Sequence, residues 1–471
     1  MHIFKHFHDK ASGTKSVVGR RSIWSAPKFS LRKYGLLTAG LLTLAGGIIL
    51  FAATPNASFN ADNGTLTSGA TKQACAGSSD GNCVVFGGST SSNKIIGIIG
   101  QFENGSYDYT QNAVQMGAQW YREDVWGDNA GVEFTRCSTY FNYSSDTNCG
   151  TQHMLNTIAN HGIRTLLLLN YGVGNANGGI ENVDFVNPGT CSTSSNYNTC
   201  LTQCSSPTYT GTCTSQLGWV QAAVYTAYNY GQGGTFWKGR TDLGSQFMEI
   251  GNEVYNPLES SGPWSCVYDT LTVNGVVYHE CFDPADYAKM VKLVSIAVTA
   301  TTNGHVKTLL DSEPKYTTDT QGDSGNWPHD MLAAVPDLAS YVGGVTVHPY
   351  GDIPNTGVCV GSPCSTSSNF SYPNNLQLTH QAWPTLPVYV TEVGQQSKSV
   401  GYTGQCKAIN QYFDDLRANS WEAGLFIFSQ KGWSTGGYDL VQGPDPPPGT
   451  LEPGWYAYQS QALHQKDYSS C

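Results

Sequence analysis

Two glutamates stand where apolar runs of the chain end. Glu253 follows Asn252 directly after the run that closes in MEIG, and Glu392 closes the run VYVTE. A protonated carboxyl beside an ionised one supplies a general acid and a nucleophile. That pair cleaves a glycosidic bond with retention at C1 when the carboxyl groups lie ~5–5.5 Å apart. Asn252 could hold a sugar 2-hydroxyl, a contact that strengthens in the transition state.

Other polar and aromatic residues end neighbouring runs and could support this chemistry. Arg122 ends an earlier run and could keep Glu392 ionised, while Tyr350 could donate a hydrogen bond to the same carboxylate. His348 opens the segment HPYG and gains a role only through its partners. Trp433 follows the last run and could form a stacking floor for a sugar ring. We therefore take Arg122, His348, Tyr350 and Trp433 as candidate supporting residues.

The chain also has acidic residues that compete with Glu253 and Glu392, and it lacks the motifs of several other chemistries. Asp311 and Glu313 are further carboxylates after a run, and Glu103 lies after the first run, where it lines a cleft or is simply solvated. The sequence has no GxSxG, HExxH or GxxxxGK[ST] motif, which argues against a serine hydrolase, a zinc protease and a nucleotide-binding loop. Nothing in it implies a metal or an organic cofactor.

The elements that must position these residues are short apolar strands alternating with helices. The runs are continuous rather than alternating, as expected of strands buried on both faces. Eight such strands, each followed by a helix, predict a (β/α)₈ TIM barrel with long, disulfide-linked loops. A doubly wound open sheet is the alternative, although GQFENGSYD is not the Gly-rich loop it would need. The expected strands are residues 95–102, 118–124, 164–170, 246–251, 306–311, 343–348, 387–392 and 423–429, and the expected helices are 150–162, 215–231, 284–303, 403–420 and 454–466.

Three motifs together resemble clan A glycoside hydrolases. They are IGNEV at 250–254, HPYG at 348–351 and TEVG at 391–394, and Arg122 adds to them. The pattern is most similar to family 5, with families 39 and 79 as near alternatives. The resemblance covers residues 94 to 466. It implies that Glu253 is the acid/base and that Glu392 is the nucleophile.

The first part of the chain differs in composition from the rest. Residues 1–34 are basic, and residues 35–53 are an uncharged apolar run of 19 residues, long enough at ~1.5 Å per residue to approach the ~30 Å bilayer core. We expect a cytoplasmic basic region followed by a signal peptide or a single transmembrane anchor. Residues 54–93, rich in Ser, Thr, Asn and Gly, read as a flexible linker to a catalytic domain over 94–471.

Charge and cysteine content indicate an exported, acidic protein. The whole chain has 24 basic and 35 acidic residues, a net charge of −11, and the part after residue 53 has 16 against 34. Such a body would repel nucleic acid. All 14 cysteines follow the apolar run, which suits disulfides formed outside the cytoplasm. Spacing suggests the pairs Cys75/Cys83, Cys137/Cys149, Cys266/Cys281, Cys359/Cys364 and Cys406/Cys471, with two more among Cys191, Cys200, Cys204 and Cys213.

The sequence thus predicts a secreted or membrane-anchored, monomeric retaining glycosidase that acts on a polysaccharide or oligosaccharide. It would touch the membrane only through its N-terminal segment. Two alternatives stay open: a non-catalytic carbohydrate-binding protein of the cell surface, and a transglycosylase that uses the same site.

Overall fold

The computed structural model describes two short strands near the start and most of the chain from Lys94 to Cys471. The described residues begin with 70–74 and 82–86. Beyond residue 94, the gaps are 101–102, 105–106, 125–149, 170–196, 210–212, 214–215, 255–268, 274–275, 281–283, 313–325, 360–370, 432–436 and 442–449. The described residues belong to two units, divided between residues 89 and 90, and each unit is described by itself.

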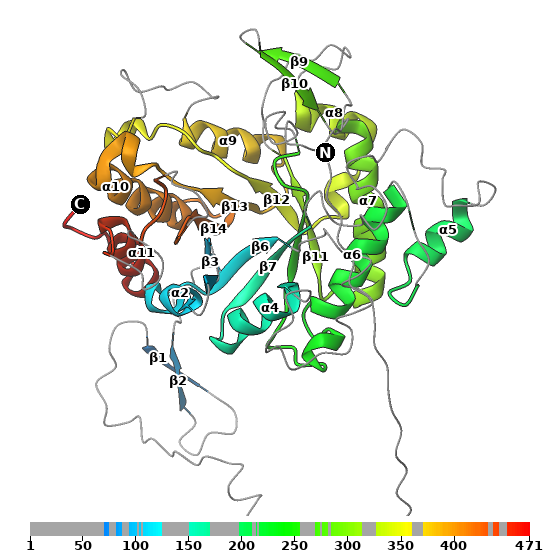
Figure 1. The fold of residues 1–471 in the computed structure, drawn as a ribbon, viewed down its shortest axis with the longest axis horizontal. Coiled ribbons are helices and arrows are strands. Elements are labelled where there is room, and N and C mark those ends of the chain that lie inside the picture. The colour runs from blue at the N-terminus through cyan, green and yellow to red at the C-terminus, as the bar shows by residue number, and fades with distance from the viewer. Residues whose placement is uncertain are drawn as a thin grey trace, which may run out of the picture. The chain divides into compact units, whose positions relative to one another are not determined.

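Eight parallel strands close into a barrel (Figure 1). Around the barrel the order is β11-β12-β13-β14-β3-β6-β7-β8, so each strand pairs with its neighbours in the chain and β14 closes onto β3. Every one of the eight predicted runs is a barrel strand, and the open-sheet alternative is wrong. The strands are β3 (Ile95–Ile99), β6 (Trp120–Asp124), β7 (Arg164–Leu169), β8 (Phe247–Ile250), β11 (Lys307–Asp311), β12 (Gly344–Val347), β13 (Val388–Val393) and β14 (Glu422–Phe428).

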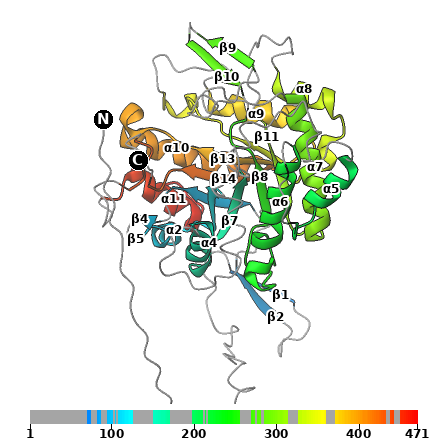
Figure 2. The ribbon, with the colours of Figure 1, turned by 45° about the vertical axis from the view of Figure 1, so that its right-hand side comes forward.

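Helices follow each strand and surround the barrel (Figures 1 and 2). The five predicted helices are present as α4, α6, α7, α10 and α11, and α6 packs beside α7. The sequence pattern does not predict α2, α5, α8 and α9. The bounds are α2 (Thr110–Met116), α4 (Gly150–Asn160), α5 (Tyr197–Cys204), α6 (Gln216–Tyr230), α7 (Pro284–Thr302), α8 (Trp327–Ala334), α9 (Tyr372–Ala382), α10 (Ser397–Ala418) and α11 (Pro453–His464).

Two helix ends show how local sequence sets these bounds. Pro284 is the first residue of α7, where its missing N–H costs no hydrogen bond, and the helix stops before Asn303 and Gly304, both at positive φ. In α10 the predicted start at residue 403 falls just after Gly401, whose φ of 72° interrupts the helix. The first turn of α10 is therefore separated from its main body by a glycine.

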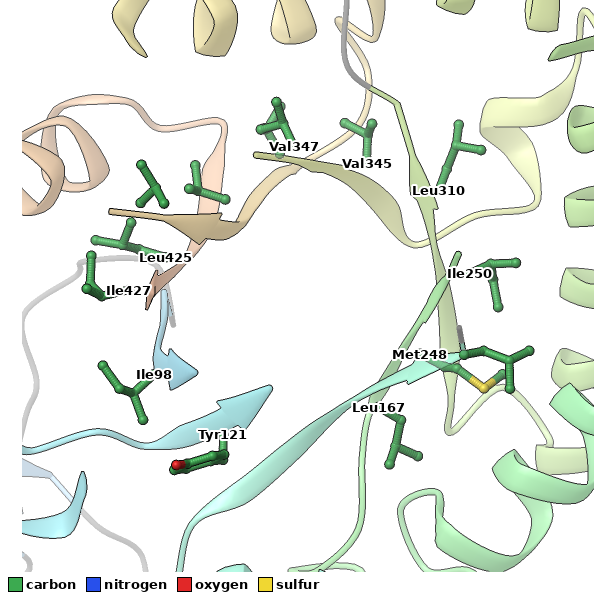
Figure 3. Packing of buried hydrophobic residues seen from close by; sticks show 14 of the residues in the cluster. Ile98, Tyr121, Leu167, Met248, Ile250, Leu310, Val345, Val347, Leu425 and Ile427 are labelled. Carbon is green, nitrogen blue, oxygen red and sulfur yellow. The ribbon is translucent and has the colours of Figure 1, made fainter. Parts of the chain in front are cut away.

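Side chains of the barrel strands form two apolar layers. Residues such as Leu167, Ile250 and Leu310 belong to the large cluster that contacts the helices, and Figure 3 shows them pointing away from the centre of the barrel. Their neighbours along the strands face inward and form a second cluster. The inward set is Ile95, Ile99, Trp120, Leu166, Leu309, Tyr389 and Phe426. Because side chains alternate along a strand, inward residues two positions further on form the next layer toward the barrel mouth.

Smaller elements lie outside the barrel. Antiparallel pairs join β4 (Glu103–Asn104) to β5 (Tyr107–Asp108), and β9 (Asp269–Val273) to β10 (Val276–Glu280). In the N-terminal unit, β1 (Ala70–Ala74) pairs with β2 (Asn82–Phe86), within the segment expected to be a linker. Nothing described tests the linker role, which stays a prediction.

Two disulfides are described, and both agree with the expected pairings. Cys406 in α10 is bonded to Cys471 at the C-terminus, and Cys204 is bonded to Cys213. Cys200 and Cys359 are also disulfide-bonded. Three further predicted pairs each include at least one residue outside the described part of the chain: Cys75/Cys83, Cys137/Cys149 and Cys266/Cys281. The partners expected for Cys200 and Cys359 also lie outside it.

Among the described residues, none of the helices combines the length and the apolar character needed to cross a bilayer. The apolar run at 35–53 lies outside them, so the signal peptide and the anchor remain predictions.

Gly97 gives a test of the packing inside the barrel. It pairs in register with Phe426, and a Cβ at Gly97 would lie 2.2 Å from the Phe426 ring. We expect Gly97→Ala to lower the free energy of unfolding by ~1–3 kcal/mol, because the fully buried ring would have to shift within the packed interior of the barrel. The double variant Gly97→Ala/Phe426→Leu should recover part of this loss in urea unfolding. Unchanged stability of Gly97→Ala alone would contradict the packing described.

Candidate active site

A polar layer lies above the inner apolar layer of the barrel. Trp120, Phe247 and Tyr389 face inward, and two residues further along their strands stand Arg122, Glu249 and Thr391. All three are buried, and they lie on the side of the inner apolar layer that faces the carboxyl ends of β6, β8 and β13, the end of a (β/α)₈ barrel where ligands bind. Alternation along the strands therefore aims these polar side chains at one another.

Arg122 is the centre of this layer. Its Nε donates to Glu249 Oε2 at 2.7 Å, Nη1 donates to Glu392 Oε2 at 3.2 Å, and Nη2 donates to Asn252 Oδ1 at 2.8 Å. The guanidinium is only 4% exposed. The buried Arg122 side chain thus joins β6 to β8 and β13, and it also holds Asn252, which follows β8.

Glu249 was missed by the sequence analysis. Its side chain has no exposed surface and also accepts a hydrogen bond from Thr391 Oγ1 at 2.8 Å. Burial acts to raise the pKa of Glu249, but the charges of Arg122 and His348 outweigh it and bring the pKa down to about 2. Glu249 is therefore ionised and neutralises Arg122. The signal in the sequence was an acidic residue inside the apolar run FMEI.

His348, after β12, connects the polar layer with Glu253. Its Nδ1 lies 2.9 Å from Glu253 Oε1, and its Nε2 lies 3.2 Å from Thr391 Oγ1. Burial acts to lower the pKa of His348, but the nearby carboxylates, that of Glu392 first, hold it well above its ordinary value. An imidazolium donates from both nitrogens, so His348 donates to Glu253 and to Thr391.

Tyr350 binds the other glutamate. Its hydroxyl donates to Glu392 Oε1 at 2.5 Å. Burial and the Glu392 carboxylate raise the pKa of Tyr350 well above its ordinary value, so the phenol keeps its proton. Tyr438, which the sequence analysis did not select, packs edge-on against Tyr350 with ring centroids 5.7 Å apart. Burial raises the pKa of Tyr438, and the charges of both glutamates add to this rise.

The two candidate catalytic carboxylates approach each other closely. One oxygen of Glu253, one of Glu392 and a ring nitrogen of His348 lie within 4.8 Å of one another. The two carboxylate side chains are 12% and 17% exposed, whereas His348 has no exposed side-chain surface. A molecule at the barrel mouth therefore meets the carboxylates and not the groups behind them. The same three atoms are near enough to one another to hold a metal ion.

The loop that carries Glu253 is held in place from below. Gly251 and Glu253 have positive φ values of 86° and 48°, which bend the chain sharply after β8. The buried Asp311 carboxylate accepts a hydrogen bond from the N–H of Val254 at 2.9 Å, and Tyr287 donates to the Ile250 carbonyl at 2.5 Å. Asp311 was weighed only as a competing carboxylate. Here it anchors the acid-bearing turn.

The structure brings together Arg122, Asn252, Glu253, His348, Tyr350 and Glu392, all chosen from the sequence. Trp433 and Glu313 lie outside the described residues. The fold and this cluster define a (β/α)₈ barrel with three carboxylates, an arginine and a histidine at its mouth.

Similar barrels occur among solved glycoside hydrolases. A family 39 enzyme from Bacteroides cellulosilyticus WH2 has a TM-score of 0.46 at 15% identity, over 82% of this chain and 67% of that one. A family 5 endo-β-1,4-glucanase from Bacillus licheniformis has a TM-score of 0.40 at 11% identity, over 79% and 59%. Thermotoga maritima Cel5A, solved with cellobiose, has a TM-score of 0.39 at 11% identity, over 78% and 96%. No protein-family model and no curated protein matches the sequence.

Glu249 generates a pH-dependent prediction. Its pKa in the folded protein, about 2, lies below the ordinary 4.5, so its stabilisation is complete above pH 4.5 and is lost as the pH falls toward 2. The difference corresponds to ~3 kcal/mol. We expect Glu249→Gln to be less stable at pH 7 by ~3–5 kcal/mol, because Arg122 loses its buried counter-charge. In urea unfolding, the difference in free energy of unfolding between the native protein and the variant should become smaller as the pH falls from 4.5 to 2. A difference that does not change with pH would show that Glu249 is not ionised in the folded protein.

Proposed function

We propose that this protein is a retaining glycoside hydrolase in which Glu392 is the nucleophile and Glu253 is the acid/base. The observation that carries the proposal is the approach of the two carboxylates, whose nearest oxygens lie within 4.8 Å. Retaining enzymes hold their carboxyl groups ~5–5.5 Å apart, whereas inverting enzymes leave ~6.5–9.5 Å for a water molecule. The spacing therefore favours attack by Glu392 itself on the anomeric carbon.

The hydrogen bonds around each glutamate support these separate roles. Glu392 accepts hydrogen bonds from Arg122 Nη1 and from the Tyr350 hydroxyl, and these two donors hold its carboxylate in place. Glu253 Oε1 faces His348 Nδ1. In the first step, Glu392 bonds to C1 while the proton of Glu253 goes to the leaving oxygen. In the second step, Glu253 takes a proton from water, and the water oxygen replaces Glu392 at C1.

We propose that the substrate is an oligosaccharide or polysaccharide and that the protein works outside the cytoplasm. We assign Asn252, held by Arg122, to a sugar 2-hydroxyl, and the ring of Tyr438, packed against Tyr350, adds an aromatic surface. Export rests on the apolar run at 35–53 and on the cysteine content of the chain after it. A screen of β-glucan, mannan, xylan and arabinan would define the sugar and would show whether cleavage starts at chain ends.

Replacement of either glutamate tests the assignment. Glu253→Gln and Glu392→Gln should each lower kcat/KM by at least ~10²–10⁴-fold on an aryl glycoside, because each removes a group that reacts. Added azide distinguishes the roles. With Glu253→Ala, azide should restore turnover and give a glycosyl azide product that has the anomeric configuration of the substrate. With Glu392→Ala, the glycosyl azide product should have the opposite configuration.

Wild-type turnover in either variant would overturn the proposal. Binding of oligosaccharides without any product from the native protein would favour a carbohydrate-binding protein. Longer products with excess acceptor sugar would favour a transglycosylase.

Tyr350 provides a second, milder test. Tyr350→Phe keeps the ring that packs on Tyr438 but removes the hydroxyl that donates to Glu392. We expect kcat to fall ~10–100-fold, the cost of one charge-assisted hydrogen bond of ~1.5–3 kcal/mol, with the unfolding midpoint nearly unchanged. The matched control is Tyr341→Phe, whose hydroxyl donates to the exposed Asp337. Equal kcat values for the two variants would show that the Tyr350 hydroxyl has no role in the reaction.

A further inference from the structure

Glu253 and Glu392 are held in place by different parts of the barrel. Glu392 belongs to β13 itself, and its carboxylate accepts hydrogen bonds from Arg122 and Tyr350. Glu253 lies in a turn that follows Ile250, the last residue of β8. The position of Glu392 is therefore set by a barrel strand, whereas the position of Glu253 depends on the backbone of a turn.

The backbone of this turn has a conformation that needs support from its surroundings. Glu253 has a φ of 48°, in the left-handed region that residues other than glycine seldom adopt. Gly251 has a φ of 86°, and a Cβ at this position would lie 2.3 Å from Cγ1 of Val254. Such backbone persists only where neighbouring structure holds it. The contacts of the turn with other elements therefore decide where Glu253 stands.

Asp311, the last residue of β11, supports the turn directly after Glu253. Its Oδ2 accepts a hydrogen bond from the N–H of Val254 at 2.9 Å, and Asp311 is fully buried. A buried N–H that loses its acceptor has no water to replace it, so the backbone moves or the group stays unpaired at a cost. Because this N–H belongs to the residue after Glu253, such a movement shifts the glutamate.

Tyr287, in α7, supports the start of the same turn. Its hydroxyl donates to the carbonyl of Ile250 at 2.5 Å and accepts from the N–H of Asp311 at 3.1 Å. The side chain of Tyr287 is fully buried. One hydroxyl therefore joins the end of β8 to the end of β11. Together, Tyr287 and Asp311 hold the chain on both sides of Glu253.

We propose that Asp311 and Tyr287 are positioning residues for the acid/base, which act through Glu253 and leave Glu392 in place. The inference rests on the proposed function, in which Glu253 protonates the leaving oxygen. Loss of either support would impair this proton transfer, while Glu392 would still attack C1. A reacting group misplaced by ~1 Å can cost ~10²-fold in rate.

Two substrates with different leaving groups separate the two effects. Phenyl and 2,4-dinitrophenyl glycosides of the sugar that the native protein cleaves would be compared, since phenolate needs a proton to leave and dinitrophenolate does not. We expect Asp311→Leu to lower kcat/KM by ~10–100-fold on the phenyl glycoside and by less than ~3-fold on the dinitrophenyl glycoside. Asp311→Asn keeps an oxygen that accepts from Val254, so it should stay within ~3-fold of the native protein on both.

Tyr287→Phe is a milder variant, and the chain offers a matched control for it. Tyr287→Phe should show the same selective loss on the phenyl glycoside, because the Ile250 carbonyl loses its donor. Tyr458→Phe also removes a fully buried hydroxyl that donates to a strand carbonyl, that of Gly97 at 2.9 Å. It should lower the unfolding midpoint without changing the ratio of the two kcat/KM values. Circular dichroism would check that each variant is folded.

The outcomes distinguish this proposal from the one on which it rests. Equal losses on both substrates in Asp311→Leu and Tyr287→Phe, or no loss in either, would overturn the positioning role. Glu253→Gln is measured beside them. A selective loss on the phenyl glycoside in Glu253→Gln alone overturns only the positioning role. No selective loss in Glu253→Gln overturns the assignment of the acid/base, and the positioning role fails with it.

Discussion

The buried ion pair between Arg122 and Glu249 is the interaction on which the candidate site depends. A guanidinium with almost no exposed surface is stable only with a counter-charge, and Glu249 supplies one at 2.7 Å. With that charge neutralised, the remaining N–H groups of Arg122 are available for Glu392 and Asn252. The pair lies inside the barrel on β6 and β8. The positions of these two strands therefore fix Arg122, and Arg122 in turn fixes Glu392 and Asn252.

Charge balance around this pair explains how the site can hold one mobile proton. Arg122 and His348 bring two positive charges, and Glu249, Glu253 and Glu392 bring three carboxyl groups. In a medium of low dielectric constant, a cluster with no net charge is the most stable one, so we infer that one of the three carboxyls is protonated at rest. Arg122 and His348 bring the pKa of Glu249 down to about 2, so Glu249 stays ionised. The proposed acid step requires the proton to be on Glu253 when the substrate binds.

The sequence predicted the strands better than it predicted the layer below the active site. Continuous apolar runs mark strands buried on both faces, and their ends mark the barrel mouth, which is why Glu253, His348 and Glu392 could be selected. Glu249 and Thr391 sit within such runs, and their role depends on which face of the strand turns inward, which becomes clear only from the register of neighbouring strands. The short helices α2 and α8, of seven and eight residues, gave too few apolar positions to show a helical period.

The two ends of the barrel show that partners, rather than burial alone, decide the state of a carboxyl group. Glu249 and Glu422 are both fully buried on barrel strands. At the mouth, a guanidinium 2.7 Å away brings the pKa of Glu249 down to about 2. At the base, the nearest cation, Lys94, donates to helix carbonyls instead, and burial brings the pKa of Glu422 up to about 8. The same residue type is thus a fixed negative charge beside a guanidinium, and a neutral group near pH 7 where it is equally buried without an ion pair among the described contacts.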